Sequence, residues 1–169
     1  GGRGRDRAHA PNADEAVLRR VDHFEPGAIR GELLAQCGGG HELDLAALDQ
    51  VEAVVDGMEG IVHLGGFSVE GPWEMILQSN IVGCYNLFEA ARRKGVKRIV
   101  FASSNHAVGF YPRHRRIGTD VTVRPDSRYG VSKAFGEALG ALYADKHGLR
   151  VACLRIGHVL EAPVDRRRL

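Results

Sequence analysis

The chain has 169 residues, with 23 lysines and arginines against 21 aspartates and glutamates, which gives a formal net charge of +2. This length suits one domain of ordinary size, and a hydrophobic share of 44% with 26% charged residues is typical of a folded globular protein. The near-neutral charge argues against a nucleic-acid partner, and no apolar run reaches the roughly 18 residues of a membrane span. The odd number of dispersed cysteines argues against a disulfide scaffold or a metal site and for the cytoplasm.

The first residues form a segment without large apolar side chains. Residues 1–15 are rich in glycine and arginine and predict a flexible basic lead-in. Alternating arginines would suit a nucleic-acid arm, but no aromatic side chain lies between them to stack on bases. The folded domain is therefore expected to span residues 16–169.

The remaining sequence alternates between strand and helix patterns. Apolar runs predict strands, amphipathic spacing predicts helices, and glycines mark the ends of the two long helices. The expected elements are a strand at Ala16–Asp22, a helix at Ala46–Val55 capped by Asp44, a strand in Gly60–Gly66, a helix at Trp73–Lys94, a strand at Arg98–Ser104, a helix at Ser127–His147 and a strand at Arg150–Gly157. This alternation indicates βαβ units and an α/β fold with a parallel sheet flanked by helices.

Three residues inside these elements could suggest chemistry but are expected to pack. His63 lies within an apolar strand and is interpreted as a core residue. Cys84 and Cys153 fall in predicted core elements and are expected to act as small hydrophobic side chains.

Small or hydrogen-bonding residues follow three of the predicted strands. They are Gly65-Gly66-Phe67-Ser68, Ser103-Ser104-Asn105-His106 and Gly157-His158. In open parallel sheets, ligands bind beyond the carboxyl ends of the strands. The sequence therefore predicts a ligand site at this edge.

The spacing of Tyr129 and Lys133 adds a chemical signal. In a helix, residues four apart share one face. A phenol has a pKa near 10 and is a poor base at neutral pH, but an adjacent ammonium favours the phenolate and lowers that pKa. Tyr129 could then accept a proton from a substrate hydroxyl that Ser104 holds in place. Taken alone, the spacing favours two surface side chains by chance. The Ser-Ser and Gly-Gly pairs that end the two preceding strands reverse this interpretation in favour of a catalytic pair.

These residues give the sequence a resemblance to the extended short-chain dehydrogenase/reductases, with their Ser and Tyr-x-x-x-Lys arrangement, and within them to the uronate dehydrogenase branch. The stretches that carry the resemblance are IVHLGGFSVEGPWEMILQSNIVGCYNLFEAARR, RIVFASSNHAVGFYP, RPDSRYGVSKAFGEAL and RIGHVLEAPVDRRRL. It implies a Rossmann-like fold and NAD-dependent oxidation of a uronate at C1 to an aldarolactone.

The resemblance also implies roles for individual residues. The catalytic set would be Tyr129 as proton acceptor, Lys133, Ser104 and Asn80. The NAD-binding residues would be Asp22, Asp44, Leu45, Leu64, Gly65, Gly66, Phe67 and Lys133. The sugar would contact Ser68, Ser104, Asn105, His106, His158 and Arg167. The helices Trp73–Lys94 and Ser127–His147 resemble those through which members of this family form homo-oligomers.

The sequence departs from the family pattern in three places. We find no strand followed by a T-G-x-x-G-x-x-G turn, the motif that binds the pyrophosphate. The first strand and about a hundred residues at the other end are expected to be missing, and NAD affinity is therefore expected to be weak. His158 stands where a small hydroxyl residue is expected, which bears on one contact to the sugar.

Two other functions are compatible with the same motifs. One is a sugar-nucleotide epimerase or dehydratase of the same superfamily. The other is a non-catalytic fragment that only associates with an intact homologue.

Overall fold

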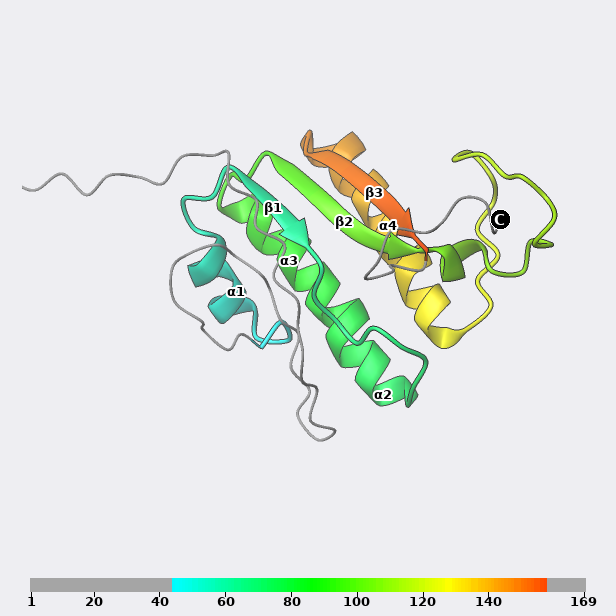
Figure 1. The fold of residues 1–169 in the computed structure, drawn as a ribbon. Coiled ribbons are helices and arrows are strands. Elements are labelled where there is room, and N and C mark those ends of the chain that lie inside the picture. The colour runs from blue at the N-terminus through cyan, green and yellow to red at the C-terminus, as the bar shows by residue number, and fades with distance from the viewer. Residues whose placement is uncertain (1–43, 158–169) are drawn as a thin grey trace, which may run out of the picture.

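The computed structural model describes residues 44–157, and these residues form alternating helices and strands (Figure 1). The elements in chain order are α1 (Leu48–Val55), β1 (Gly60–His63), α2 (Trp73–Ile76), the π-helix η1 (Leu77–Val82), α3 (Gly83–Arg93), β2 (Arg98–Ser104), the 3-10 helix η2 (Asn105–Val108), α4 (Arg128–His147) and β3 (Arg150–Ile156). The strand expected at Ala16–Asp22 lies outside the described residues.

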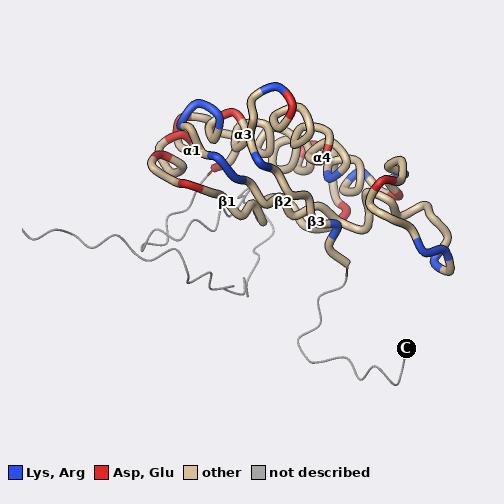
Figure 2. The backbone as a smooth tube through the Cα atoms, turned by 90° about the horizontal axis from the view of Figure 1, so that it is seen from above, with Lys and Arg blue, Asp and Glu red and all other residues tan. Residues whose placement is uncertain are grey.

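The three strands form one parallel sheet in the order β1-β2-β3. The register aligns His63 with Phe101 and Phe101 with Cys153, so the three strands point their carboxyl ends toward the same edge. Helices α3 and α4 lie on one face of this sheet, with α1 beside α3 (Figures 1 and 2). This arrangement confirms the predicted α/β class and is a Rossmann-like fold.

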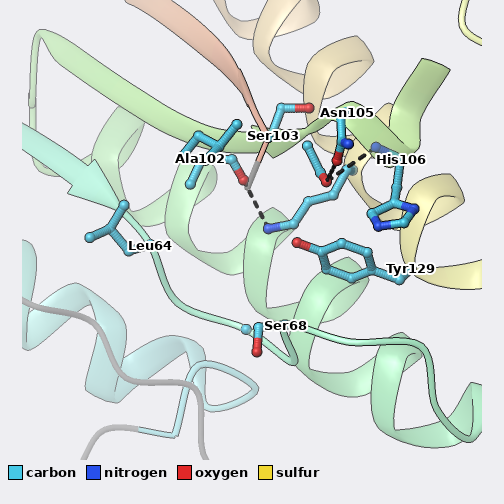
Figure 3. A pocket seen from close by; sticks show the side chains of 12 residues that line it. Leu64, Ser68, Ala102, Ser103, Asn105, His106 and Tyr129 are labelled. Carbon is cyan, nitrogen blue, oxygen red and sulfur yellow. Dashed lines mark hydrogen bonds between the residues drawn. The ribbon is translucent and has the colours of Figure 1, made fainter. Parts of the chain in front are cut away.

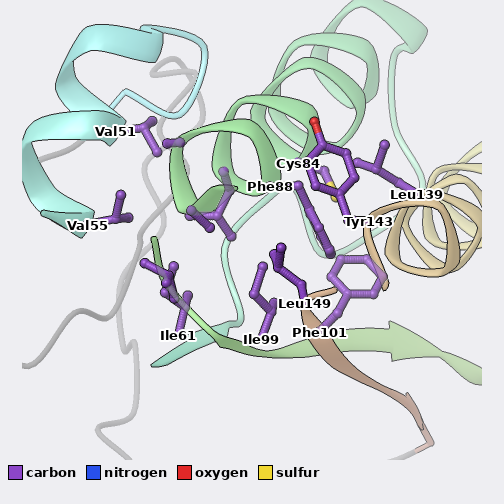
Figure 4. Close-up of a cluster of buried hydrophobic side chains, with 14 of the residues drawn as sticks. Val51, Val55, Ile61, Cys84, Phe88, Ile99, Phe101, Leu139, Tyr143 and Leu149 are labelled. Atoms are coloured by element: carbon purple, nitrogen blue, oxygen red, sulfur yellow. The ribbon is translucent and has the colours of Figure 1, made fainter. Parts of the chain in front are cut away.

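The hydrophobic core lies between the sheet and the helices (Figure 4). Strand side chains alternate between the two faces, so Ile99 and Phe101 are buried under the helices. Phe88 from α3 lies between Phe101 and Tyr143, with ring centroids 6.4 Å and 5.4 Å away. His63 is also buried and its ring faces Phe101, which confirms that it is a packed residue.

Helix α1 is joined to α3 by polar contacts as well as by packing. Asn86 donates hydrogen bonds of 2.9 Å to the carbonyls of Leu45 and Ala46, just before α1. Arg93 on α3 pairs with Glu52 on α1 at 2.8 Å. Figure 2 shows that acidic and basic residues are interspersed along α1 and α3.

Several predicted boundaries differ from the structure. The first helix begins at Leu48 rather than Ala46, because the Asp44 side chain accepts a hydrogen bond from the Ala46 amide in a turn before the helix. The strand predicted in Gly60–Gly66 ends at His63, and the helix predicted at Trp73–Lys94 contains a π-helical segment.

The long helix α4 has the expected terminal signals. Ser127 is its N-cap, since its hydroxyl accepts a hydrogen bond from the Gly130 amide at 3.0 Å. Gly148 ends the helix in the left-handed conformation, as predicted.

The two predicted core cysteines differ in burial. Cys84 is buried, as expected, but Cys153 is exposed, so the prediction for Cys153 is wrong. Cys153 lies on β3, and within residues 44–157 no strand pairs with the outer edge of β3.

Candidate active site

A pocket of about 390 Å³ lies at the carboxyl edge of the sheet, where the sequence predicts a ligand site (Figure 3). It is bounded by the segments that follow β1 and β2, the end of β3 and the first turns of α4. The lining residues are Leu64, Gly66, Ser68, Ala102, Ser103, Ser104, Asn105, His106, Tyr129, Lys133, Ile156 and Gly157. The strand ends and the Tyr–Lys pair thus come together from separate parts of the sequence.

Tyr129 and Lys133 occupy one face of α4, one turn apart. The Lys133 ammonium lies 5.4 Å from the centroid of the Tyr129 ring and donates a hydrogen bond of 2.8 Å to the Ala102 carbonyl. Only 6% of Lys133 is exposed. Helical spacing therefore places the two groups as predicted, and the β2 backbone fixes the ammonium in the pocket.

The pKa of Tyr129 differs from the sequence prediction. Its pKa is raised above 10, because burial of the phenol outweighs the lowering caused by the Ser104 hydroxyl. Burial also lowers the pKa of Lys133 to about 8. The prediction that Lys133 brings the Tyr129 pKa below its ordinary value is therefore wrong in this structure, since desolvation acts on both groups and favours their neutral forms.

The end of β2 and the start of η2 place three polar residues beside Tyr129. The Ser104 hydroxyl accepts a hydrogen bond from the His106 amide at 3.2 Å and donates one of 3.2 Å to the Asn105 side chain. It therefore begins the short helix η2 as an N-cap. The ring of His106 packs edge-on against Tyr129, with centroids 5.8 Å apart (Figure 3).

Asn80 fixes the loop after β1 to helix α4. Its side-chain oxygen accepts a 2.6 Å hydrogen bond from the Phe67 amide, and its nitrogen donates to the Phe67 carbonyl at 2.9 Å. The same nitrogen donates to the Ser132 hydroxyl on α4 at 3.0 Å. These contacts reach Phe67 and Ser132 rather than Lys133, so the expected part of Asn80 in a proton relay stays a prediction.

Gly66 allows this close approach of the loop to Asn80. Its φ of +118° lies in a region that side chains rarely adopt, and a Cβ there would lie 2.6 Å from the Asn80 side-chain oxygen. Asn80 itself sits in the π-helical segment η1. Such segments are often found at functional sites, and hydrophobic periodicity gave no sign of this one.

Glu70 is a residue near the site to which sequence reasoning gave no role. Its carboxylate accepts hydrogen bonds from the Tyr129 amide at 2.9 Å and from the Arg128 side chain at 2.8 Å. These contacts lower the pKa of Glu70, the Tyr129 amide most of all. Glu70 thereby joins the loop that carries Ser68 to the start of α4. In the sequence, the only sign of such a role was that Glu70 lies in one of the stretches that carry the family resemblance.

Some predicted site residues lie away from the pocket or outside the described part. Leu45 is 1% exposed and its side chain is part of the core, whereas Asp44 beside it is exposed. Gly65, Phe67 and Asn80 are not among the residues that line the pocket. Asp22, His158 and Arg167 fall outside residues 44–157, and the roles predicted for all these residues stay predictions.

Two negative findings apply to residues 44–157. No group of three or more histidine, cysteine, aspartate or glutamate side chains in this range is placed to hold a metal ion. Among the helices of the same range, none is both long enough and apolar enough to cross a membrane.

Comparisons with known proteins agree with this geometry. The chain is 56% identical over 128 residues to the uronate dehydrogenase of Agrobacterium fabrum and 45% identical over 140 residues to that of Pseudomonas syringae pv. tomato. These matches cover 76% and 80% of this chain but 48% and 51% of the relatives. The chain thus spans about half the length of the curated relatives that it matches.

The structural comparison gives the same relationship. A mutant of the uronate dehydrogenase from Agrobacterium tumefaciens, solved in complex with NAD, is 55% identical with a TM-score of 0.71. The match covers 75% of this chain and 48% of that one. The model of the NAD dependent epimerase/dehydratase family matches residues 4–163. The chain therefore belongs to the NAD dependent epimerase/dehydratase family.

Proposed function

We propose that this site oxidises a uronate at C1 with NAD. The observation that carries the proposal is the convergence of Ser104, Tyr129 and Lys133 in one pocket at the carboxyl edge of the sheet. The identity of 56% to a uronate dehydrogenase supports the choice of substrate. Because the chain spans about half of such relatives, the activity is proposed for the protein to which these residues belong.

In the proposed reaction, the C1 hydroxyl of the sugar lies between Ser104 and Tyr129. The Tyr129 oxygen accepts the hydroxyl proton, the C1 hydrogen departs as a hydride, and C1 becomes the carbonyl of an aldarolactone. Ser104 donates a hydrogen bond to the reacting oxygen. Burial raises the pKa of Tyr129, and in the proposed reaction the Lys133 ammonium one helical turn away offsets part of that cost by favouring the phenolate. NAD supplies the hydride acceptor when it is bound.

The residues beside Lys133 suit a dinucleotide. The Gly66 backbone approaches the pocket without a side chain, and the cationic Lys133 lies at its base. We assign the cofactor to Leu64, Gly65, Gly66, Phe67 and Lys133, with Asp22, Asp44 and Leu45 as further predicted contacts. The sugar is assigned to Ser68, Ser104, Asn105 and His106, with His158 and Arg167 as further predicted contacts.

The experiment that tests this function is NADH formation from glucuronate at millimolar NAD. We expect Tyr129→Phe to lower kcat by about a thousandfold, within the range of general-base catalysis. Tyr111→Phe is the matched control, because Tyr111 lies outside the pocket and its hydroxyl donates only to the Thr122 carbonyl among the described contacts. Equal rates in the two variants would refute the assignment of Tyr129 as the base.

The epimerase or dehydratase alternative makes a different prediction about substrate. It predicts turnover of a nucleotide sugar without net NADH formation, whereas the uronate proposal predicts NADH and a lactone. Product analysis with glucuronate and with a nucleotide sugar distinguishes the two.

We further propose that α3 and α4 pair with a second copy of the protein. Val131 and Leu142 lie eleven residues apart, which is three helical turns, so they share one face of α4. They are 45% and 50% exposed, and Tyr85 on α3 is 46% exposed. A dimer mass by light scattering is expected.

The cytoplasmic setting also remains a proposal that rests on cysteine usage.

A further inference from the structure

Within residues 44–157, Asp126 contacts the pocket through His106. The Asp126 carboxylate lies 2.9 Å from His106 Nδ1, and the same oxygen accepts a 3.0 Å hydrogen bond from the Ser127 hydroxyl. His106 lines the pocket, and Figure 3 shows its ring above that of Tyr129. Asp126 thus stands behind the pocket-lining imidazole.

The surrounding backbone holds Asp126 in this place. Its amide donates a 3.3 Å hydrogen bond to the His106 carbonyl, and Arg124, two residues earlier, donates from its amide to the Ala107 carbonyl at 3.0 Å. Gly109 packs directly against the Asp126 carboxylate, where a Cβ would collide with it. Residues 106–109 and 124–126 therefore form a fixed pair of segments, which keeps the backbones of Asp126 and His106 side by side.

This contact determines which ring nitrogen carries the proton. Burial raises the pKa of Asp126, but the hydrogen bonds from His106 and Ser127 together outweigh it and lower the pKa, so the carboxylate is ionised at neutral pH. An ionised carboxylate can only accept hydrogen bonds, and therefore Nδ1 of His106 must donate. In the neutral ring, Nε2 is then left as a hydrogen-bond acceptor.

We propose that Asp126 is a positioning residue, which orients His106 so that Nε2 accepts a hydrogen bond from a hydroxyl group of the sugar substrate. This proposal rests on the proposed function for the identity of the sugar. The orientation of His106 by Asp126 follows from the geometry of residues 104–129 alone. The same contact favours sugars that have a hydroxyl at that position over deoxy sugars.

The test combines nitrogen NMR of the full ¹⁵N-labelled chain with titration of glucuronate. We expect His106 of the unaltered protein to be protonated at Nδ1, with an Nε2 resonance that shifts when glucuronate is added. In Asp126→Ala, most of His106 should change to the Nε2-protonated form that an unrestrained histidine prefers. Glucuronate should then bind about tenfold more weakly, the value of roughly one lost hydrogen bond.

Two further variants separate positioning from general disruption. Asp126→Asn keeps the size of the side chain and its place beside Ser127, and we expect the same direction of change. Asp120→Ala is the matched control, because Asp120 is an exposed aspartate in the same connection that makes no contact with His106. Under conditions of turnover, Asp126→Ala should raise KM with little change in kcat, since it weakens binding without touching the reacting atoms.

The outcomes distinguish this proposal from the proposed function. An unchanged tautomer of His106 in both Asp126 variants would overturn the positioning role, even if uronate oxidation were found. A changed tautomer with unaltered glucuronate affinity would overturn the sugar contact. Absence of any response to glucuronate in the unaltered protein would refute the substrate and the contact together, whereas the tautomer result would still decide the role of Asp126.

Discussion

The two faces of the sheet differ sharply in their surroundings. On the face beneath α3 and α4, Ile61, Ile99 and Phe101 are 6%, 1% and 2% exposed. On the other face, Val62 and Leu154 are 49% and 51% exposed. The described residues therefore obtain their core from one face, and that same face carries α4 and its Tyr129–Lys133 pair.

Within residues 44–157, the residues that stabilise the fold and the residues of the proposed site therefore lie in different places. The covered face is apolar and closely packed, so it fixes α4 against β2 and thereby sets the distance between Lys133 and the Ala102 carbonyl. The carboxyl edge instead buries the ammonium of Lys133, whose pKa is lowered by desolvation, and this burial has a cost in stability. Changes at the two places should have opposite effects on folding.

The largest expected effect on stability concerns the covered face. Ile99→Ala should lower the free energy of unfolding by about 3 kcal/mol, because it leaves a cavity among fully buried side chains. Leu154→Ala is the matched change on the exposed face and should cost under about 1 kcal/mol. Urea denaturation of both variants measures the difference. Similar losses in the two variants would show that the faces are equally packed in solution.

A smaller effect of opposite sign is expected at Lys133. Burial lowers the pKa of this lysine from 10.5 to about 8, so the folded protein disfavours its charged form. The resulting destabilisation is complete below pH 8 and absent above pH 10.5, and it corresponds to about 3 kcal/mol. Lys133→Met also loses the hydrogen bond to Ala102, worth about 1 kcal/mol.

We therefore expect Lys133→Met to be about 2 kcal/mol more stable than the unaltered protein at pH 7 while losing its activity. The advantage should disappear as the pH rises from 8 to 10.5. Lys146→Met, at an exposed lysine in the last turn of α4, is the control. A less stable Lys133→Met at pH 7 would show that the ammonium in the pocket favours folding.

The sequence was most informative where a local pattern decides the structure. The β-branched and aromatic run Arg98–Ser104 predicted β2 to the residue, and Gly148 marked the end of α4. The four-residue spacing of Tyr129 and Lys133, together with the rule for strand ends, predicted that Ser104 would meet them. These features depend on neighbours in sequence or on the general topology of parallel sheets.

Features that depend on tertiary contacts could not be predicted in the same way. The π-helical turn around Asn80 arises where its side chain binds the backbone of Phe67, thirteen residues away. The pKa of Tyr129 is set by how much of the phenol is buried, which a spacing pattern does not contain. Glu70 and Asp126 reach their partners because of the paths of the loops that carry them, and the sequence did not predict those paths.

The central claim is that Ser104 and Tyr129 act as one unit on the C1 hydroxyl. It is tested most directly by kcat/KM for NADH formation in Ser104→Ala, Tyr129→Phe and the double variant. Because both side chains must hold the same oxygen, we predict that the double variant is no slower than the slower single variant. Losses that multiply in the double variant would mean that the two residues act independently, and would contradict the mechanism.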